Sequence, residues 1–168
     1  GTDSSFTVGR IQGYGGPAPD FNVMHISNLA AKEKLIINHG VNQNTAGAGT
    51  VPRRAEIVTK WANTSAALNR FTAVDYLSSG SGYAAGAEVV VLGWDPADTH
   101  TTNFWEELAS VELGSAGASL SSGTITAKKY LWVQVFLEHL GGSNPNTLWR
   151  FNSDSGNNYA NRSSHDGG

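Results

Sequence analysis

The strongest constraint on the fold is an alternation of apolar and polar residues with a period of two, which recurs at short intervals along the chain. Clusters of Gly, Asn, Ser and Pro separate the alternating runs. This pattern is typical of strands with one buried face in β-sandwiches and barrels. We expect strands at Phe6–Ile11, Phe21–Ile26, Lys34–His39, Ala55–Trp61, Leu68–Tyr76, Glu88–Trp94, Trp105–Leu113, Tyr130–Leu137, Thr147–Phe151 and Tyr159–Arg162.

The segment Trp105–Leu113 is also open to a helical interpretation, because Glu and Leu favour helices. Alternation that continues through Val111 and Leu113 favours a strand, with Glu107 and Ala109 on the same face as Trp105. No segment has a convincing helical pattern. The predicted fold class is therefore all-β with little or no helix: a two-sheet antiparallel β-sandwich of the jelly-roll type.

Composition agrees with this fold and excludes several classes of protein. Gly, Ser, Thr and Asn make up 64 of the 168 residues. No apolar stretch approaches the roughly 18 residues of a membrane-spanning helix. The 11 Lys and Arg are scattered among 14 Asp and Glu, so there is no basic stripe to neutralise phosphates. We expect neither a membrane nor a nucleic acid as partner.

Length predicts a single domain over residues 1–168 with one core. The chain begins with Gly1 and its only methionine is Met24, which indicates a processed product, an excised unit or a trimmed chain. A faint repeat relates Ala30–Ile37 to Thr126–Val133 and Lys60–Ser65 to Arg150–Ser155. We expect these corners to lead into equivalent strands of the two sheets.

Motifs of catalysis are missing from the sequence. The five histidines lack zinc-site spacing, there is no cysteine, and no nucleophile elbow or phosphate loop occurs. We predict that the protein is not an enzyme and needs no cofactor. One weak calcium candidate remains in an oxygen-rich loop, with Asn152, Asp154 and Asn157 as ligands. A tight turn stabilised by Asn and Asp side chains explains the same residues.

The aromatic residues have the most potential for binding. In Tyr130–Leu137 the face opposite the aliphatic residues carries Tyr130, Trp132 and Phe136, which is unusually aromatic for a solvated surface. We predict that these three form an interface for self-association. The alternative is a glycan site, because flat rings suit sugar faces; its candidate residues are Trp61, Trp94, Trp149, Arg150 and Tyr83. Large rings also fill cores and buried interfaces.

Two stretches, Ile125–Gln134 and Trp149–Ala160, resemble repeated β-sandwich domains of structural and appendage proteins from marine tailed phages, archaeal viruses and marine archaea. The stretches Lys34–Ile37, Val41–Gly49 and Lys60–Ser65 resemble the companion half of that family. The resemblance covers most of the chain. It implies a virion, extracellular or cell-surface location and supplies no catalytic residues.

The order of the two halves departs from that family. There, the half that begins near Phe104–Leu108 precedes the half that ends near Val91–Trp94; here the order is reversed. The resemblance thus implies a unit of a tandem array or a circular permutant, with halves at about 1–95 and 104–168. Permutation needs termini that lie close together, so we expect residues 1 and 168 to be neighbours.

Three functions follow from these observations. The first is a non-enzymatic building block of a virion appendage, capsid or surface assembly, which self-associates as a homotrimer or a larger oligomer by analogy with phage fibres. The second is a monomeric carbohydrate-binding module that recognises a host or algal polysaccharide. The third is a filament subunit in which one strand completes the sheet of a neighbour.

Overall fold

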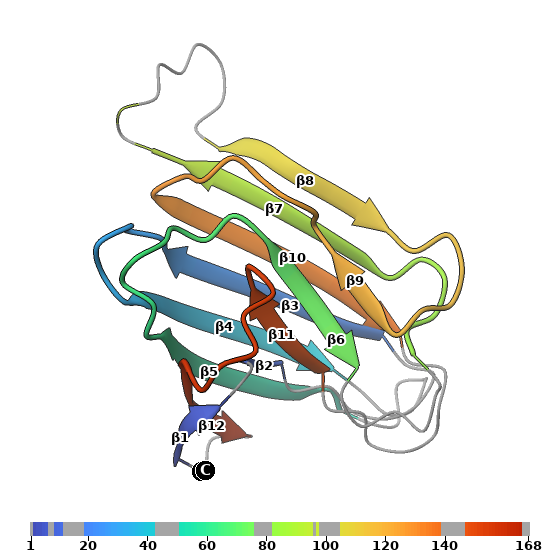
Figure 1. The fold of residues 1–168 in the computed structure, drawn as a ribbon. Helices are drawn as coiled ribbons and strands as arrows, with labels where there is room; N and C mark the ends of the chain where they lie inside the picture. Colours follow the sequence, from blue (N-terminus) through green and yellow to red (C-terminus); the bar gives the residue numbers. More distant parts are fainter. Residues whose placement is uncertain are drawn as a thin grey trace.

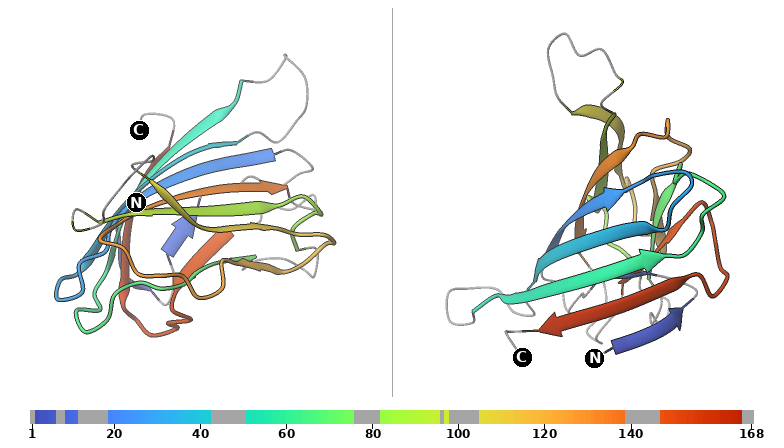
Figure 2. Two further views of the ribbon diagram at one scale, coloured as in Figure 1. Left: turned by 90° about the horizontal axis from the view of Figure 1, so that it is seen from above. Right: turned by 90° about the vertical axis from the view of Figure 1, so that its left-hand side faces the viewer.

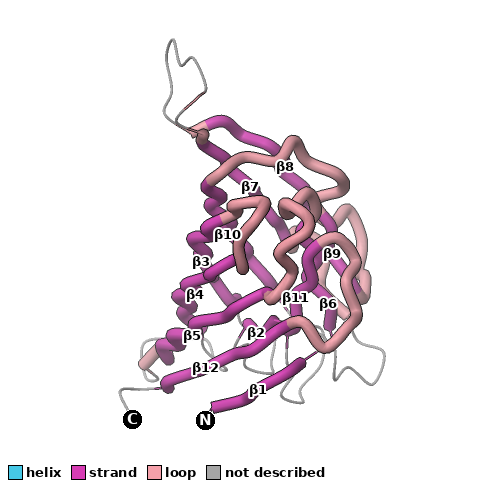
Figure 3. The backbone as a smooth tube through the Cα atoms, turned by 60° about the vertical axis from the view of Figure 1, so that its left-hand side comes forward, coloured by secondary structure: helices cyan, strands magenta, loops and turns pink. Residues whose placement is uncertain are grey.

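The computed structural model describes residues 2–6, 9–11, 19–42, 51–75, 82–95, 97, 105–138 and 147–165. All regular structure in these ranges is β-strand (Figure 3). The strands are β1 (Thr2–Phe6), β2 (Gly9–Ile11), β3 (Pro19–Ser27), β4 (Lys34–Asn42), β5 (Arg53–Trp61), β6 (Phe71–Asp75), β7 (Glu88–Trp94), β8 (Glu106–Glu112), β9 (Ser119–Ser121), β10 (Tyr130–Glu138), β11 (Thr147–Phe151) and β12 (Tyr159–His165). No helix in the described ranges could cross a membrane.

The strands form two antiparallel sheets that pack face to face, which confirms the predicted sandwich. The large sheet has eight strands in the order β1-β12-β5-β4-β3-β10-β7-β8, and the small sheet has four in the order β2-β11-β6-β9 (Figure 1). Only β3-β4-β5 and β7-β8 are consecutive neighbours within one sheet. The other connections between named strands cross from one sheet to the other, as in jelly rolls.

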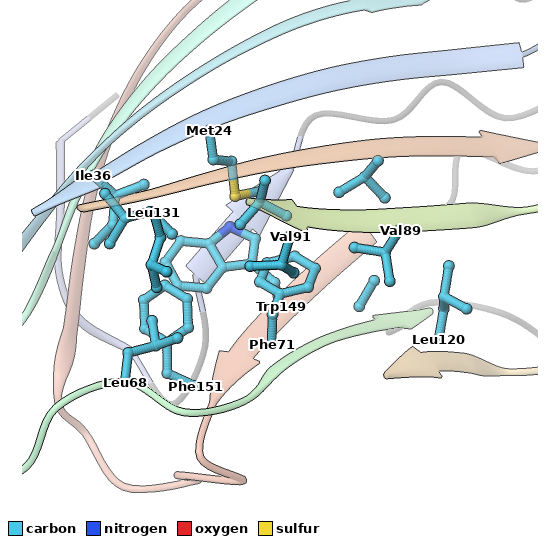
Figure 4. Close-up of a cluster of buried hydrophobic side chains, with 14 of the residues drawn as sticks. Met24, Ile36, Leu68, Phe71, Val89, Val91, Leu120, Leu131, Trp149 and Phe151 are labelled. Atoms are coloured by element: carbon cyan, nitrogen blue, oxygen red, sulfur yellow. The ribbon is translucent and has the colours of Figure 1, made fainter. Parts of the chain in front are cut away.

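The hydrophobic core lies between the two sheets, whose two layers Figure 2 shows from further directions. The large sheet contributes aliphatic residues such as Met24, Val91 and Leu131, and the small sheet contributes large rings. Trp149 lies in the middle of this cluster, close to Phe71 and Phe151 (Figure 4). The small sheet is narrow, so its few strands fill the layer with aromatic volume.

The predicted strands agree with the structure at most positions. The segment Phe6–Ile11 is the clearest error: it contains parts of β1 and β2, which lie in different sheets. The predicted strands do not include the short strand β9. Its three residues, Ser119, Leu120 and Ser121, include a single apolar residue, which is too few to show a period of two. The segment Leu68–Tyr76 contains β6, which begins later, at Phe71.

The strand β8 confirms the prediction of a strand over a helix but corrects its faces. Val91 pairs with Ala109 while Leu92 pairs with Glu107, so Leu108 is an extra residue in a β-bulge. A bulge shifts the alternation by one position. Glu107 and Ala109 therefore lie on opposite faces, and Leu108 packs partly against the core.

The two corners of the faint repeat do not lead into different sheets. The strands β4 and β10, which follow them, lie in the large sheet on either side of β3. The expectation of one equivalent strand in each sheet is therefore wrong. The second pair of repeat positions does meet across the core: the rings of Trp61 and Phe151 have centroids 5.5 Å apart.

The first and last described strands are neighbours at one edge of the large sheet. Thr2 of β1 pairs with Arg162 of β12, and Figure 3 shows the two strands side by side. Residues 1 and 168 themselves lie outside the described residues. The circular permutation and the single domain over 1–168 stay predictions.

Candidate functional site: the outer face of the large sheet

The strand β4 has its apolar residues on the unexpected side. Leu35 and Ile37 point away from the core and have 59% and 48% of their surface exposed. The side chains that point inward and are buried include Lys34 and Asn38. A strand at the surface of a sandwich normally does the opposite. The side of the large sheet that faces away from the small sheet, called the outer face below, therefore carries aliphatic residues where solvated polar ones would be expected.

The neighbouring strands extend this apolar surface. Strand register aligns their outward residues in four rows that cross β7, β10, β3, β4 and β5. The rows are Trp94-Tyr130-Ser27-Leu35-Lys60, Leu92-Trp132-His25-Ile37-Val58, Val90-Gln134-Val23-His39-Glu56 and Glu88-Phe136-Phe21-Val41-Arg54. The centre of three of the rows is mainly apolar or aromatic, the third row has Gln134 and His39 beside Val23, and the charged residues lie at the ends.

Aromatic side chains stack along two of these rows. The rings of Trp94 and Tyr130 are stacked with centroids 5.2 Å apart. Trp132 stacks on His25 at 5.8 Å and meets Trp105 edge to face at 5.8 Å. Beside them lies a pocket of about 380 Å³. Its walls are formed by His25, Ile26, Ser27, Leu35, Ile37, Trp94, Trp105, Tyr130 and Leu131.

Charged residues flank the apolar centre on both sides. On the β7 and β8 side, Glu88 pairs directly with Glu112 across the strands. The β5 side carries both signs, with Arg54, Glu56 and Lys60 pointing outward; the ammonium of Lys60 is 3.2 Å from the carboxylate of Glu33. Like charges directly opposite on neighbouring strands destabilise a sheet, so the Glu88–Glu112 pair is an unfavourable feature of the isolated chain.

All three predicted interface residues lie on the outer face. Tyr130 and Phe136 are exposed and Trp132 is half-buried, while the alternate residues of β10 point into the core as predicted. The role of these three residues as an interface stays a prediction. Sequence reasoning missed their neighbours on β3, β4 and β5. The sequence did contain a signal: the consecutive apolar residues Leu35, Ile36 and Ile37 must place apolar side chains on both faces of β4. Alternation alone does not say which of these two faces is buried.

The glycan candidates do not form one site. Trp61, Trp149 and Tyr83 are buried in the core, where no sugar can reach them, so the core alternative holds for these three. Arg150 lies on β11 in the small sheet, and Trp94 lies on the outer face of the large sheet. Their separation has a simple cause: strands of both sheets contribute rings to the same core.

The buried rings are held by specific contacts. The Trp61 indole N–H donates a hydrogen bond of 2.7 Å to Asp154, and the Lys34 ammonium lies 5.5 Å from the Trp61 ring centre. The hydroxyl of Tyr159 accepts a hydrogen bond of 3.0 Å from the backbone N–H of Phe151. Burial raises the pKa of Tyr159 and of Tyr83, because the phenolate would be desolvated. These residues serve the core.

The loop with the calcium candidates is a turn. The Asn152 side-chain oxygen accepts hydrogen bonds from the backbone N–H groups of Asn69 and Arg70, at 2.8 and 3.0 Å. Both carboxylate oxygens of Asp154 accept from N–H groups as well. Oxygens surrounded by N–H donors face positive partial charges and do not suit a cation. The contacts of Asn152 and Asp154 support the turn interpretation, and the weak calcium candidate stays untested.

Within the described residues, no three His, Asp or Glu side chains come together as a metal site. His25 and His39 are outward residues of β3 and β4. His100 and His139 lie outside the described residues. The absence of a cofactor stays a prediction.

No protein-family model and no curated protein matches this sequence. Among solved structures, the chain is similar to the C-terminal domain of a chitobiase from Bacteroides fragilis, with 10% sequence identity and a TM-score of 0.29. The match covers 71% of this chain and 68% of that domain. A likeness at this TM-score bears on neither the fold nor the function of this chain.

Proposed function

We propose that the protein is a non-enzymatic structural β-sandwich that self-associates through the outer face of its large sheet. One observation carries the proposal: β4 directs Leu35, Ile37 and Val41 outward while it buries Asn38 and Asn42. Exposed apolar patches of more than a few hundred Å² are rare on monomers and mark interaction surfaces. Burial of this face against another protein surface would remove its apolar side chains from water and so stabilise the complex.

The character of the pocket also favours a protein partner. Its walls combine the rings of Trp94 and Tyr130 with the aliphatic side chains of Leu35 and Ile37. A sugar site needs several hydrogen-bond partners for hydroxyls beside its aromatic rings. Here the polar groups in the wall are the side chains of His25 and Ser27, the Tyr130 hydroxyl and the indole N–H groups, and the described residues of the wall include no carboxylate, amide or guanidinium. An apolar centre with a charged rim is the anatomy of a subunit interface.

The setting of this assembly is a further part of the proposal. The resemblance to appendage and structural proteins of tailed phages and archaeal viruses supports a virion appendage, a capsid or a cell-surface assembly, and a location on the virion or outside the cell. Fibres of that kind are trimeric, which is the reason for expecting a homotrimer or larger oligomer.

Substitution at the centre of the face tests self-association. We expect Ile37→Lys and Trp132→Ala to lower the mass of the oligomer in sedimentation velocity, because a buried lysine charge or a lost ring weakens the contact. Val51→Lys is the matched control, since Val51 is 82% exposed and lies outside the strands. If neither face variant changes the distribution of species while all variants stay folded, the face is not the interface.

A second candidate is recognition of a polysaccharide at the same pocket. The stacked rings of Trp94 and Tyr130, with Trp105 beside them, favour it. This function predicts a monomer whose tryptophan fluorescence is quenched by a host or algal polysaccharide, and loss of the quenching in Trp94→Ala. A self-associating building block would instead show no response to the sugars.

The filament function receives no support from the strand pairing. It requires a terminal strand that leaves its own sheet, whereas β1 pairs with β12 and β12 pairs with β5 of the same chain.

A further inference from the structure

The charges on the outer face are distributed unevenly across the strands. The β8 side is acidic, with Glu107 opposite Leu92 and Glu112 opposite Glu88. The β5 side carries Arg54, which pairs with Val41, and Lys60. Glu112 and Arg54 lie in the same row, at the two ends of the row that contains Phe136 and Phe21. Glu56 also points outward from β5, between Arg54 and Lys60, so the β5 side carries mixed charges with one more cation than anion; it is called the basic side below.

Two copies that pack outer face to outer face can be related by a two-fold axis in only two aligned ways, because packed sheets keep their strands within about 30° of each other. An axis perpendicular to the strands would set each strand over its own copy and bring acidic side against acidic side. An axis parallel to the strands reverses the strand order. It places the acidic side of each copy over the basic side of the other and keeps each row over itself.

We propose that the partner on the outer face is a second copy of this chain, related by a two-fold axis that runs parallel to the strands between β10 and β3. This inference rests on the proposed self-association and names its geometry. It departs from the homotrimer expected by analogy with fibres, since a two-fold pair gives a dimer or a larger assembly built from dimers. Because β10 and β3 lie at the centre of the six strands β8-β7-β10-β3-β4-β5, the axis sets β10 over the partner's β3, β7 over its β4 and β8 over its β5.

Several positions then meet matching chemistry, while Glu88 faces Val41 of the partner subunit and Val90 faces His39 of the partner subunit. Phe136 faces Phe21 of the partner subunit, and Trp94 and Leu92 of β7 face the aliphatic residues of the partner's β4. Glu112 faces Arg54 of the partner subunit, so a cation offsets the repulsion between Glu112 and Glu88. Charge complementarity of this kind sets the register of an interface and discriminates against the alternative axis.

The size of the face is sufficient for a specific dimer. Six strands at a spacing of about 4.8 Å and seven residues at a rise of about 3.3 Å cover roughly 29 by 23 Å, or about 650 Å² before side-chain relief is counted. A standard interface buries about 800 Å² on each partner. The flat area of the face alone already lies within the range of about 600–1,000 Å² per partner that specific interfaces bury.

A charge exchange between the two sides tests the axis. We expect Arg54→Glu and Glu112→Arg to raise the dimer dissociation constant about tenfold each in sedimentation equilibrium, since the symmetry repeats every contact twice and tenfold corresponds to about 1.4 kcal/mol. The double variant carrying both substitutions should return to within about threefold of the unaltered protein, as the ion pair is restored with its signs exchanged. Lys32→Glu, in the exposed turn before β4, is the control for net charge.

The outcomes separate this inference from the proposed function. Two weakened single variants and a restored double variant support the axis. If the double variant is as weak as the singles, or if the singles bind as tightly as the unaltered protein, the axis is wrong, while dissociation by Ile37→Lys still supports self-association. A homotrimer likewise overturns the two-fold pair and leaves the proposed function standing. A protein that stays monomeric at all concentrations contradicts both.

Discussion

Single polar residues connect parts of this chain that lie far apart in sequence. The buried Asn28, just after β3, donates hydrogen bonds of 3.0 and 2.9 Å to the carbonyls of Leu68 and Lys128 and accepts one from the N–H of Leu68. Its own N–H donates to the carbonyl of Lys129. One amide therefore ties the end of β3 to the segments before β6 and before β10.

We expect Asn28→Ala to lower the free energy of unfolding by about 2–4 kcal/mol, because it leaves three buried backbone groups without partners. Chemical denaturation followed by tryptophan fluorescence measures this change. Asn69→Ala is the control: its side chain is exposed and its loss should cost no more than about 0.5 kcal/mol. Equal effects of the two substitutions would show that the Asn28 side chain contributes little.

Asp154 gives the stability a dependence on pH. Burial alone would raise the pKa of its carboxyl, but hydrogen bonds from Trp61, Gly156 and Asn158 outweigh this and hold the pKa below its ordinary value. A carboxyl with a lowered folded pKa stabilises the fold above its unfolded pKa of about 3.9, and this contribution is lost as the pH falls through the folded pKa.

We therefore expect Asp154→Asn to destabilise the protein by about 1–2 kcal/mol at neutral pH, a value reduced by the partial exposure of the site. The difference from the unaltered protein should shrink as the pH falls from about 4, where the carboxyl of the unfolded chain is protonated, through the lower pKa of the folded carboxyl. Urea denaturation at a series of pH values measures it. A difference that stays constant from neutral to strongly acidic pH would argue against the role of the charge.

Among the elements, the strands could be predicted from the sequence far better than their faces. Alternation located β5 and β10 well, because one of their two faces is clearly more apolar, whereas β3 and β7 stood out as runs of strand-forming residues with apolar side chains on both faces. Alternation could not predict which face of β4 is buried, because Leu35 and Ile37 lie on one face and Ile36 on the other. The buried face also carries the polar Asn38. Alternation gives two faces, and only the packing of the other sheet decides which of them is covered.

The bulge in β8 likewise could not be predicted from alternation, because a bulge adds one residue that interrupts the period of two. Leu108 occupies the extra position next to Gly93, whose missing side chain leaves room for it. We expect Gly93→Ala to destabilise the protein by about 1–3 kcal/mol, because the new methyl group would overlap Leu108 and lie 2.9 Å from the Cβ of Lys128. Thermal unfolding measures the change, and an unaltered or raised Tm would mean that the bulge adapts freely.

For the molecule as a whole, the sandwich could be predicted but its candidate site only in part. The aromatic face of β10 was evident from Tyr130, Trp132 and Phe136. The aliphatic part of the outer face was not, since it exists only because strand pairing places β3 and β4 beside β10. The glycan candidates failed for the same reason, because a list of rings does not say which of them share a surface.

The most direct test of the account is the solution mass of the unaltered protein, measured by light scattering over a series of micromolar concentrations. The chain has a mass of 17.7 kDa. Self-association through the outer face predicts a mass that is a multiple of this value and that falls toward 17.7 kDa in Ile37→Lys but not in Val51→Lys. A mass of 17.7 kDa at every concentration would contradict the account.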